Sequence, residues 1–283
     1  MGEVSPQNRL NELTAQDWLR FTKTWFVHNP PRRKKNEMLH PAKYPEDMIE
    51  EFISFFTKPN QVVFDPFLGT GSTLVAAHRT GRRGIGIELQ EKYASIASSR
   101  LQSLREQTTL TGEHVQMNQR VILGNSSKIE KVWLDNDLPE IDLVMTSPPY
   151  GPMLKKKGLA SEKRSEKGLD TQYSEDSADL GNAEGYEAFM KQLLDIFVSL
   201  KPKVKVGGHL VVILQNYMEK GNYQMLAWDF AREMAKEFQF RGERIWCQDN
   251  KTLFPYGYKY SFVPNVHHHY CLVFKKVEDE LRK

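Results

Sequence analysis

Short apolar runs alternate with amphipathic stretches along most of the chain. The apolar runs are rich in β-branched residues and bounded by Gly, Pro or polar residues, a pattern typical of buried strands. Seven strands are expected, over residues 61–65, 83–88, 120–123, 141–146, 209–214, 243–247 and 270–274. Amphipathic helices are expected over residues 45–56, 72–80, 90–107, 183–200 and 223–238. Strands alternating with helices predict an α/β fold: a doubly wound, mostly parallel, seven-stranded sheet covered on both faces.

One stretch interrupts this alternation. Residues 151–185 are polar, charged and spotted with glycine, and they show no sustained apolar period. The remaining pattern predicts a single domain over residues 1–283, with 151–185 as an insertion. Structureless loops of this length are usually functional or disordered, and a solvated surface loop is the alternative interpretation.

Charge and cysteine content exclude several protein classes. The chain carries 39 Lys and Arg against 36 Asp and Glu, a net charge of +3, which excludes a histone-like polycation but allows a local basic patch. Two cysteines, Cys247 and Cys271, cannot form a disulfide framework or a four-cysteine zinc site. The N-terminus lacks the apolar stretch of a signal peptide, and no apolar run is long enough to span a bilayer. A reducing cytoplasmic location is therefore expected.

A glycine-rich turn follows the first expected strand, where Asp65–Thr73 reads DPFLGTGST. Gly69 and Gly71 permit a sharp turn and close approach of a ligand, and the following helix offers free N–H groups. Leu74 stands where a dinucleotide fingerprint has its third small residue, and the lysine of a P-loop is missing. A carboxylate without a basic neighbour suits a cofactor that carries an ammonium group, such as S-adenosylmethionine (SAM). A tight turn without a ligand is the alternative.

Polar residues also follow the next two expected strands. Glu88 ends the second strand and is placed to accept hydrogen bonds from ribose hydroxyls, although a surface salt bridge would also explain it. Asn125 and Ser126 follow the third strand, where a short polar side chain can bond an adenine amino group. A simple turn would explain these two residues equally well.

The fourth expected strand leads into the segment Thr146–Gly151, which reads TSPPYG. Two consecutive prolines fix the backbone and remove two donors, which leaves the preceding carbonyls unpaired. The Ser147 hydroxyl and the Pro148 carbonyl can accept the two hydrogens of an exocyclic amine, while Tyr150 stacks on the heterocycle. Acceptance of both hydrogens frees the nitrogen lone pair for attack. A Pro-Pro turn beside a packed tyrosine is the alternative.

DPFLGTGS followed by SPPY resembles the SAM-dependent DNA amino-methyltransferases, which methylate N4 of cytosine or N6 of adenine. The segment HPAKYP (His40–Pro45) is similar to an additional SAM-binding segment of that family. The resemblance implies that the catalytic residues are Ser147, Pro148, Pro149 and Tyr150. It implies that the cofactor-binding residues are His40, Pro41, Ala42, Lys43, Tyr44, Pro45, Asp65, Pro66, Phe67, Gly69, Thr70, Gly71, Ser72, Thr73, Glu88, Asn125 and Ser126.

The resemblance further implies a Rossmann-like sheet with SAM at the carboxyl ends of its strands. The target base would be flipped out of double-stranded DNA, and the methyl group would be transferred directly. Neither cysteine lies in a Pro-Cys motif, which disfavours a C5-cytosine enzyme. Ser147 favours N4 of cytosine over N6 of adenine, since adenine members usually carry Asp or Asn there.

Larger members of the family carry a separate target-recognition region, for which the insertion 151–185 is the expected substitute. Its basic residues can neutralise DNA phosphates, and we expect it to be mobile without DNA. These DNA-binding candidates are Lys155, Lys156, Lys157, Lys163 and Arg164. The expected partners are double-stranded DNA and a cognate restriction endonuclease, in a prokaryotic or viral-type setting associated with the nucleoid.

Two alternative functions stay open. Guanosine-N2 methyltransferases of tRNA share the two motifs, but they usually have Asp or Asn at the position of Ser147 and an RNA-binding domain before the catalytic one. Only about 40 residues precede the first expected helix here. A DNA- or SAM-binding scaffold without turnover is the other alternative. The run His267-His268-His269 is not expected to bind a metal, because successive side chains of a strand point to opposite faces.

Overall fold

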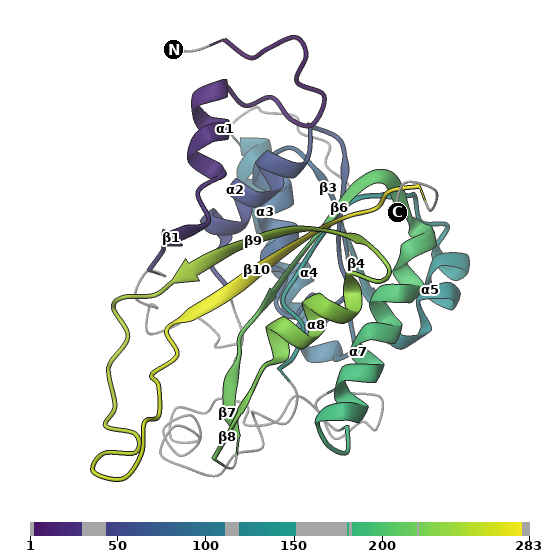
Figure 1. Ribbon diagram of the computed structural model, residues 1–283. Coiled ribbons are helices and arrows are strands. Elements are labelled where there is room, and N and C mark those ends of the chain that lie inside the picture. The colour runs from purple at the N-terminus through teal and green to yellow at the C-terminus, as the bar shows by residue number, and fades with distance from the viewer. Residues whose placement is uncertain are drawn as a thin grey trace.

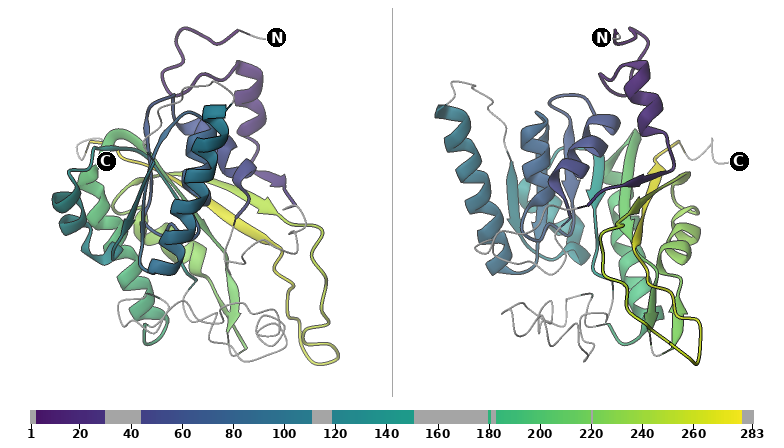
Figure 2. Two further views of the ribbon diagram at one scale, coloured as in Figure 1. Left: turned by 180° about the vertical axis from the view of Figure 1, so that it is seen from behind. Right: turned by 90° about the vertical axis from the view of Figure 1, so that its left-hand side faces the viewer.

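A computed structural model describes residues 3–29, 44–110, 119–150, 180, 183–219 and 221–278. In this part of the chain a central sheet lies between two layers of helices (Figures 1 and 2). The sheet has eight strands in the order β1-β9-β10-β6-β5-β2-β3-β4. All neighbouring pairs are parallel except those made by β10, which runs antiparallel to β6 and β9. The expected α/β fold with a mostly parallel sheet is confirmed.

The elements have the following bounds. The sheet strands are β1 (Trp25–Val27), β2 (Val62–Asp65), β3 (Arg83–Glu88), β4 (Arg120–Leu123), β5 (Ile141–Thr146), β6 (Val204–Leu214), β9 (Gln239–Cys247) and β10 (His268–Lys275). A separate two-stranded hairpin consists of β7 (Tyr217–Glu219) and β8 (Asn222–Gln224). The α-helices are α1 (Ala15–Phe21), α2 (Glu46–Phe56), α3 (Ser72–Arg79), α4 (Glu91–Leu110), α5 (Ile129–Asn136), α7 (Tyr186–Leu200) and α8 (Leu226–Met234), with 3-10 turns at η1 (Ser126–Lys128) and η4 (Lys201–Lys203).

The expectation of seven strands is wrong, because β1 adds an eighth strand at the edge beside β9. This strand has only three residues, and the ring of Trp25 and the side chain of Val27 are about half exposed, so it has no buried apolar run. The sequence pattern also did not predict α1, which precedes β1, or α5. The helix expected over 223–238 instead begins as β8, and its helical part is α8.

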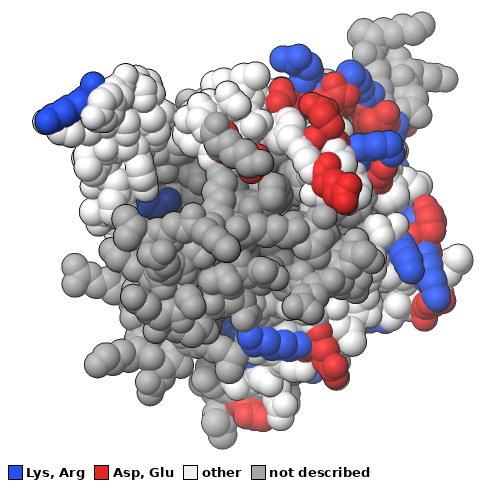
Figure 3. All heavy atoms as spheres, turned by 90° about the horizontal axis from the view of Figure 1, so that it is seen from below, with Lys and Arg blue, Asp and Glu red and all other residues white. Residues whose placement is uncertain are grey.

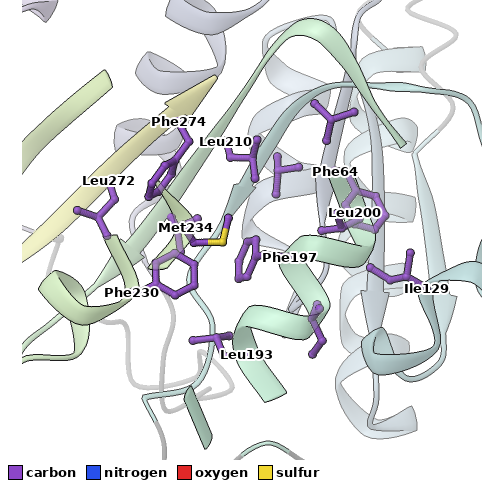
Figure 4. Packing of buried hydrophobic residues seen from close by; sticks show 14 of the residues in the cluster. Phe64, Ile129, Leu193, Phe197, Leu200, Leu210, Phe230, Met234, Leu272 and Phe274 are labelled. Carbon is purple, nitrogen blue, oxygen red and sulfur yellow. The ribbon is translucent and has the colours of Figure 1, made fainter. Parts of the chain in front are cut away.

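Alternation along the strands places apolar side chains on both faces of the sheet. In β6, Leu210, Val212 and Leu214 pack toward α5, α7 and α8, whereas Val211 and Ile213 pack toward α1, α2 and α3. Figure 4 shows the first of these clusters, in which aromatic and branched side chains interlock between sheet and helices. Two buried faces explain why these strands read as continuous apolar runs.

The N-terminal segment is held by aromatic packing. The ring of Phe21 stacks on Phe55, with ring centroids 4.0 Å apart. The guanidinium of buried Arg244 lies 3.9 Å from the Phe21 ring centroid, and its Nε donates to the Lys23 carbonyl over 3.1 Å. These contacts fix α1 against α2 and bring β1 to the edge of the sheet.

The order of strands in the sheet determines where a ligand-binding site is expected. The chain runs from β2 to β3 and β4 on one side, and β5 then pairs with the other side of β2. In open α/β sheets, ligands bind at such a switch point, outside the carboxyl ends of the strands. Here these ends are Asp65 on β2 and Thr146 on β5.

The two cysteines, Cys247 and Cys271, are both free thiols, and Cys271 is buried in β10. Among the residues that the structure describes, no helix combines the length and apolar character needed to cross a membrane.

Candidate active site at the carboxyl ends of β2 and β5

The glycine turn between β2 and α3 has the geometry that its sequence predicts. Gly69 and Gly71 have φ angles of +56° and +86°, in the left-handed region that favours glycine. A Cβ atom on Gly71 would lie 2.9 Å from the Cβ of Ala97 in α4. Glycine is therefore favoured at position 71 for two reasons: the left-handed turn into α3 and the close packing of α4 against that turn.

The carboxylate of Asp65 is fully buried at the centre of the site. Its Oδ1 accepts hydrogen bonds from the Thr146 hydroxyl over 2.6 Å and from the Phe67 N–H over 2.9 Å. Its Oδ2 accepts from the Thr73 hydroxyl over 2.5 Å and from the Tyr44 hydroxyl over 3.0 Å. Burial raises the pKa of Asp65 above its usual value, although the hydrogen bonds act in the opposite direction. Asp65 therefore ties four segments together through donors of the protein itself.

Glu88 holds the same turn from the end of β3. Its carboxylate is buried, and it accepts from the Gly69 N–H over 2.7 Å and from the Gln90 N–H over 2.8 Å. At the end of β4, the buried Ser126 hydroxyl donates to the Pro66 carbonyl. The Asn125 side chain accepts from the Ser127 N–H over 2.8 Å and caps η1. The ends of β2, β3 and β4 thus come together as expected.

One polar atom in the turn has no partner in the described part of the chain. The hydroxyl oxygen of Ser72, the first residue of α3, is buried and makes no hydrogen bond there. A buried hydroxyl without a partner is costly, so such a group in a native structure calls for an explanation. A polar ligand seated on the turn would satisfy it.

The segment His40–Pro45 is described only at its end. Tyr44 is buried and bonds Asp65 and Thr73, and Pro45 is the N-cap residue of α2. His40, Pro41, Ala42 and Lys43 lie outside the described residues, as do Lys155, Lys156, Lys157, Lys163 and Arg164.

Ser147 and Tyr150 meet at the carboxyl end of β6. The Ser147 hydroxyl donates to the Ile213 carbonyl over 3.2 Å, and its oxygen lies 3.1 Å from the Tyr150 hydroxyl oxygen. Pro148 is buried, and Pro149 and Tyr150 are half-buried. Burial raises the pKa of Tyr150, so the phenol keeps its proton. This arrangement leaves acceptor lone pairs on Ser147, because its hydrogen is used on Ile213.

A histidine that sequence reasoning weighed only as a metal ligand belongs to this group. The Nδ1 atom of His269, on β10, lies 3.3 Å from the Tyr150 hydroxyl oxygen. Its ring stacks on Trp246 at 4.6 Å between centroids. Burial lowers the pKa of His269 to about 3, and the nearby charges of Lys251 and His268 act in the same direction. The imidazole is therefore neutral, and its Nδ1 can accept a hydrogen bond from the Tyr150 hydroxyl.

Within the described residues, no group of three or more His, Cys, Asp or Glu side chains is placed to hold a metal ion. His268 turns away from His269 and lies 3.1 Å, at Nε2, from the Tyr270 hydroxyl oxygen. The signal that marks His269 is its position on β10, the strand that pairs with β6, and only the sheet order reveals this.

Thr146 joins the two motifs. It is fully buried at the end of β5, and its hydrogen bond to Asp65 crosses from β5 to β2. The next residue is Ser147, so one side chain connects the glycine turn to the Ser147–Tyr150 segment. Sequence reasoning assigned Thr146 no role, because nothing local marks a threonine that faces a neighbouring strand.

Comparison with known proteins gives matches over part of the chain. Residues 4–99 match a family model described as DNA methylase. The Type II methyltransferase M.BglII of Bacillus subtilis is 38% identical over 73 residues, 26% of this chain and 20% of that protein. M2.DpnII of Streptococcus pneumoniae, also a Type II methyltransferase, is 43% identical over 67 residues, 24% of this chain and 25% of that protein. The matched segment thus spans a quarter or less of the length of these relatives.

Two solved structures are similar to this chain at low sequence identity. An rRNA methylase from Streptococcus thermophilus is 14% identical, with a TM-score of 0.47 over 84% of this chain and 99% of that one. TrmK of M. capricolum, solved with S-adenosyl-homocysteine, is 10% identical, with a TM-score of 0.43 over 86% of this chain and 73% of that one. Over part of its length, this chain is therefore similar to DNA methylases and to Type II methyltransferases.

Proposed function

We propose that the chain is a SAM-dependent DNA methyltransferase that transfers a methyl group to N4 of cytosine in a base flipped from duplex DNA. The observation that carries the proposal is the 2.6 Å hydrogen bond from Thr146 to Asp65. It joins the glycine turn to the Ser147–Tyr150 segment at the switch point of the sheet. A cofactor turn and an amine-accepting segment at one edge are what transfer between two ligands requires.

The turn between β2 and α3 fits SAM by its donors and acceptors. The buried hydroxyl of Ser72 lacks a partner among the described residues, and the Glu88 carboxylate at the end of β3 is assigned to the ribose hydroxyls. The residues that would hold the cofactor are those of the turn (Asp65–Thr73), Glu88, Asn125, Ser126 and the segment 40–45. SAM supplies an electrophilic methyl group when bound.

The chemistry of the chain itself is to hold and activate the amine. The Ser147 hydroxyl donates its hydrogen to the Ile213 carbonyl. Its oxygen therefore accepts a hydrogen bond from the incoming amine. The Pro148 carbonyl accepts the other hydrogen. Both acceptors draw the nitrogen toward a tetrahedral geometry and direct its lone pair outward. Tyr150, oriented through His269, provides the ring surface on which the base stacks.

Cytosine rather than adenine is proposed because Ser147 stands at the first position of the catalytic segment. For DNA affinity, the proposal assigns phosphate contacts to Lys155, Lys156, Lys157, Lys163 and Arg164. The relatives named above are Type II methyltransferases. A cognate restriction endonuclease is therefore proposed as a functional partner.

The test is methylation of unmodified genomic DNA with labelled SAM, followed by mass spectrometry of the nucleosides and modification-sensitive sequencing. The expected product is N4-methylcytosine at one recurring sequence. N6-methyladenine would overturn the choice of base while keeping the reaction class. Label found only in added tRNA would favour guanosine N2, and no label in either nucleic acid would favour a scaffold without turnover.

A further inference from the structure

A long hairpin projects from the sheet at the end that carries the site. This aromatic hairpin, residues 248–267, links β9 to β10 and extends beyond the body of the molecule in the views of Figures 1 and 2. At its neck, the Gln248 N–H donates to the His267 carbonyl over 2.8 Å. Farther out, the amide of Asn265 pairs with both backbone groups of Phe254 at 2.9 Å each. The hairpin is therefore an internally bonded structure.

Its outer part exposes an unusual amount of apolar surface. Tyr260 and Phe262 are 93% and 90% exposed, and Tyr258 is 70% exposed. The exposed large side chains of the hairpin are Leu253, Phe254, Tyr256, Tyr258, Tyr260 and Phe262. Contiguous apolar surface on a protein marks an interaction site, because water is an unfavourable neighbour for it. The rings here make few contacts within the described chain, so they are available to a partner.

Charge indicates the kind of partner. Between residues 250 and 267 the sequence has no Asp or Glu, and it has Lys251 and Lys259. In Figure 3 the projection at the upper left shows white and blue surface without red. The one carboxylate of the hairpin is Asp249 at its neck, which accepts a hydrogen bond from Asn29. The outer part, with aromatic rings and lysines but no carboxylate, suits a polyanion with flat, stackable groups, as in nucleic acid.

The hairpin leads directly into β10, the strand that contacts the proposed catalytic segment. His269 follows two positions after the neck residue His267 and contacts the Tyr150 hydroxyl. The neighbouring residue Tyr270 pairs with Leu214 at the end of β6. A nucleic acid that offers a base to Ser147 and Tyr150 would therefore pass beside the hairpin.

We propose that the aromatic hairpin is a DNA-binding element. Its outer rings pack against bases and sugars next to the target nucleotide, while Lys251 and Lys259 contact phosphates. This inference rests on the proposed function, since it takes DNA as the substrate, and it concerns a surface separate from the cofactor turn. The hairpin is distinct from the insertion 151–185.

The experiment measures binding of the full chain to a fluorescent DNA duplex of mixed sequence, at two salt concentrations. The triple variant Tyr258→Ala/Tyr260→Ala/Phe262→Ala is expected to weaken binding at least tenfold with an unchanged salt slope. The double variant Lys251→Gln/Lys259→Gln is expected to lower the slope of log affinity against log salt by about 2, from two lost phosphate contacts. Leu134→Ala, which removes a side chain 82% exposed on α5, is the matched control and should bind normally.

If the affinity of the triple variant for DNA is within twofold of that of the wild type, the proposal is overturned. A protein would then be the favoured partner of this surface. SAM affinity, measured by calorimetry, should be equal in all variants and verifies that they fold. If the wild type methylates duplex DNA and the triple variant binds equally well, only the hairpin inference fails. If the wild type binds DNA through the hairpin without methylating it, only the proposed function fails. Absence of any DNA binding would overturn both.

Discussion

At the scale of single residues, the buried carboxylate of Asp65 has more than one role. A carboxylate at a cofactor turn is naturally read as the partner of a cationic ligand. Here its two oxygens already accept hydrogen bonds from Thr146, Phe67, Thr73 and Tyr44. Asp65 thus organises the site, and its negative charge is a second property available to the ammonium group of the proposed cofactor.

Asp65→Asn tests this organising role. The amide presents an NH2 group to two of the four donors, so we expect a loss of about 1–3 kcal/mol in the free energy of unfolding together with weaker SAM binding. Thr73→Val removes one donor to Asp65 together with the contact to the Tyr44 hydroxyl, and it should cause a smaller loss in the same direction. Urea unfolding and calorimetry with SAM measure the two effects. Weaker SAM binding at unchanged stability would instead indicate a purely direct contact.

Ser147→Ala tests amine activation. Removal of one acceptor should lower kcat roughly 10²- to 10³-fold, by analogy with loss of one stabilising hydrogen bond at a reacting centre. The SAM dissociation constant should stay within twofold, because Ser147 bonds Ile213 and lies outside the glycine turn. Tyr150→Phe keeps the ring and loses the hydroxyl contacts to His269, Ser147 and Ile213, so a milder decrease is expected. Single-turnover methylation of duplex DNA distinguishes the two, and equal losses would contradict separate roles.

At the scale of elements, short pieces were harder to predict than long ones. Strand β1 has three residues and α5 has eight, which is too little sequence for a period to stand out from chance. Strand β6 begins at Val204, whereas the sequence pattern predicts a start at 209. The first five residues escaped prediction because Gly207 and Gly208 interrupt the apolar pattern. The glycine turn, in contrast, was predictable, since its left-handed backbone favours glycine whatever lies around it.

Gly71→Ala tests how tightly α3 and α4 constrain that turn. The left-handed backbone costs about 1–2 kcal/mol for alanine, and the contact with Ala97 adds to this cost. Gly207→Ala is the control, because Gly207 has a φ of +87° but open space around its Cβ position. Thermal unfolding should show a larger loss for Gly71→Ala than for Gly207→Ala. Equal losses would show that the helix packing adjusts freely.

At the scale of the whole molecule, stability depends on neutral histidines inside the fold. His209 on β6 is buried against Phe56, and its Nδ1 has no partner among the described residues. Burial lowers the pKa of His209 to about 4, with the charges of Lys275 and Arg241 acting in the same direction. A folded pKa below the unfolded value means that its contribution is complete above pH 6.5 and is lost as the pH falls toward 4.

The expected outcome is a loss of about 2 kcal/mol from the free energy of unfolding between pH 7.5 and pH 5 through His209 alone. His209→Gln should be less stable at pH 7.5, because its packing changes, but it should lose less on acidification. Urea unfolding at the two pH values measures both slopes. Parallel slopes for the wild type and the variant would show that His209 charges without cost in the folded state.

The sequence by itself determined what depends on near neighbours: the alternation of strands and helices, the left-handed glycines and the stiff Ser-Pro-Pro-Tyr segment. The tertiary structure alone decided which of these features meet. The bond between Asp65 and Thr146 joins residues 81 positions apart, and the contact between Tyr150 and His269 joins residues 119 apart. Such contacts depend on the order of strands in the sheet, which is selected by burial of both faces together. The exposure of the aromatic hairpin follows for the same reason, because only the finished fold shows which rings it leaves uncovered.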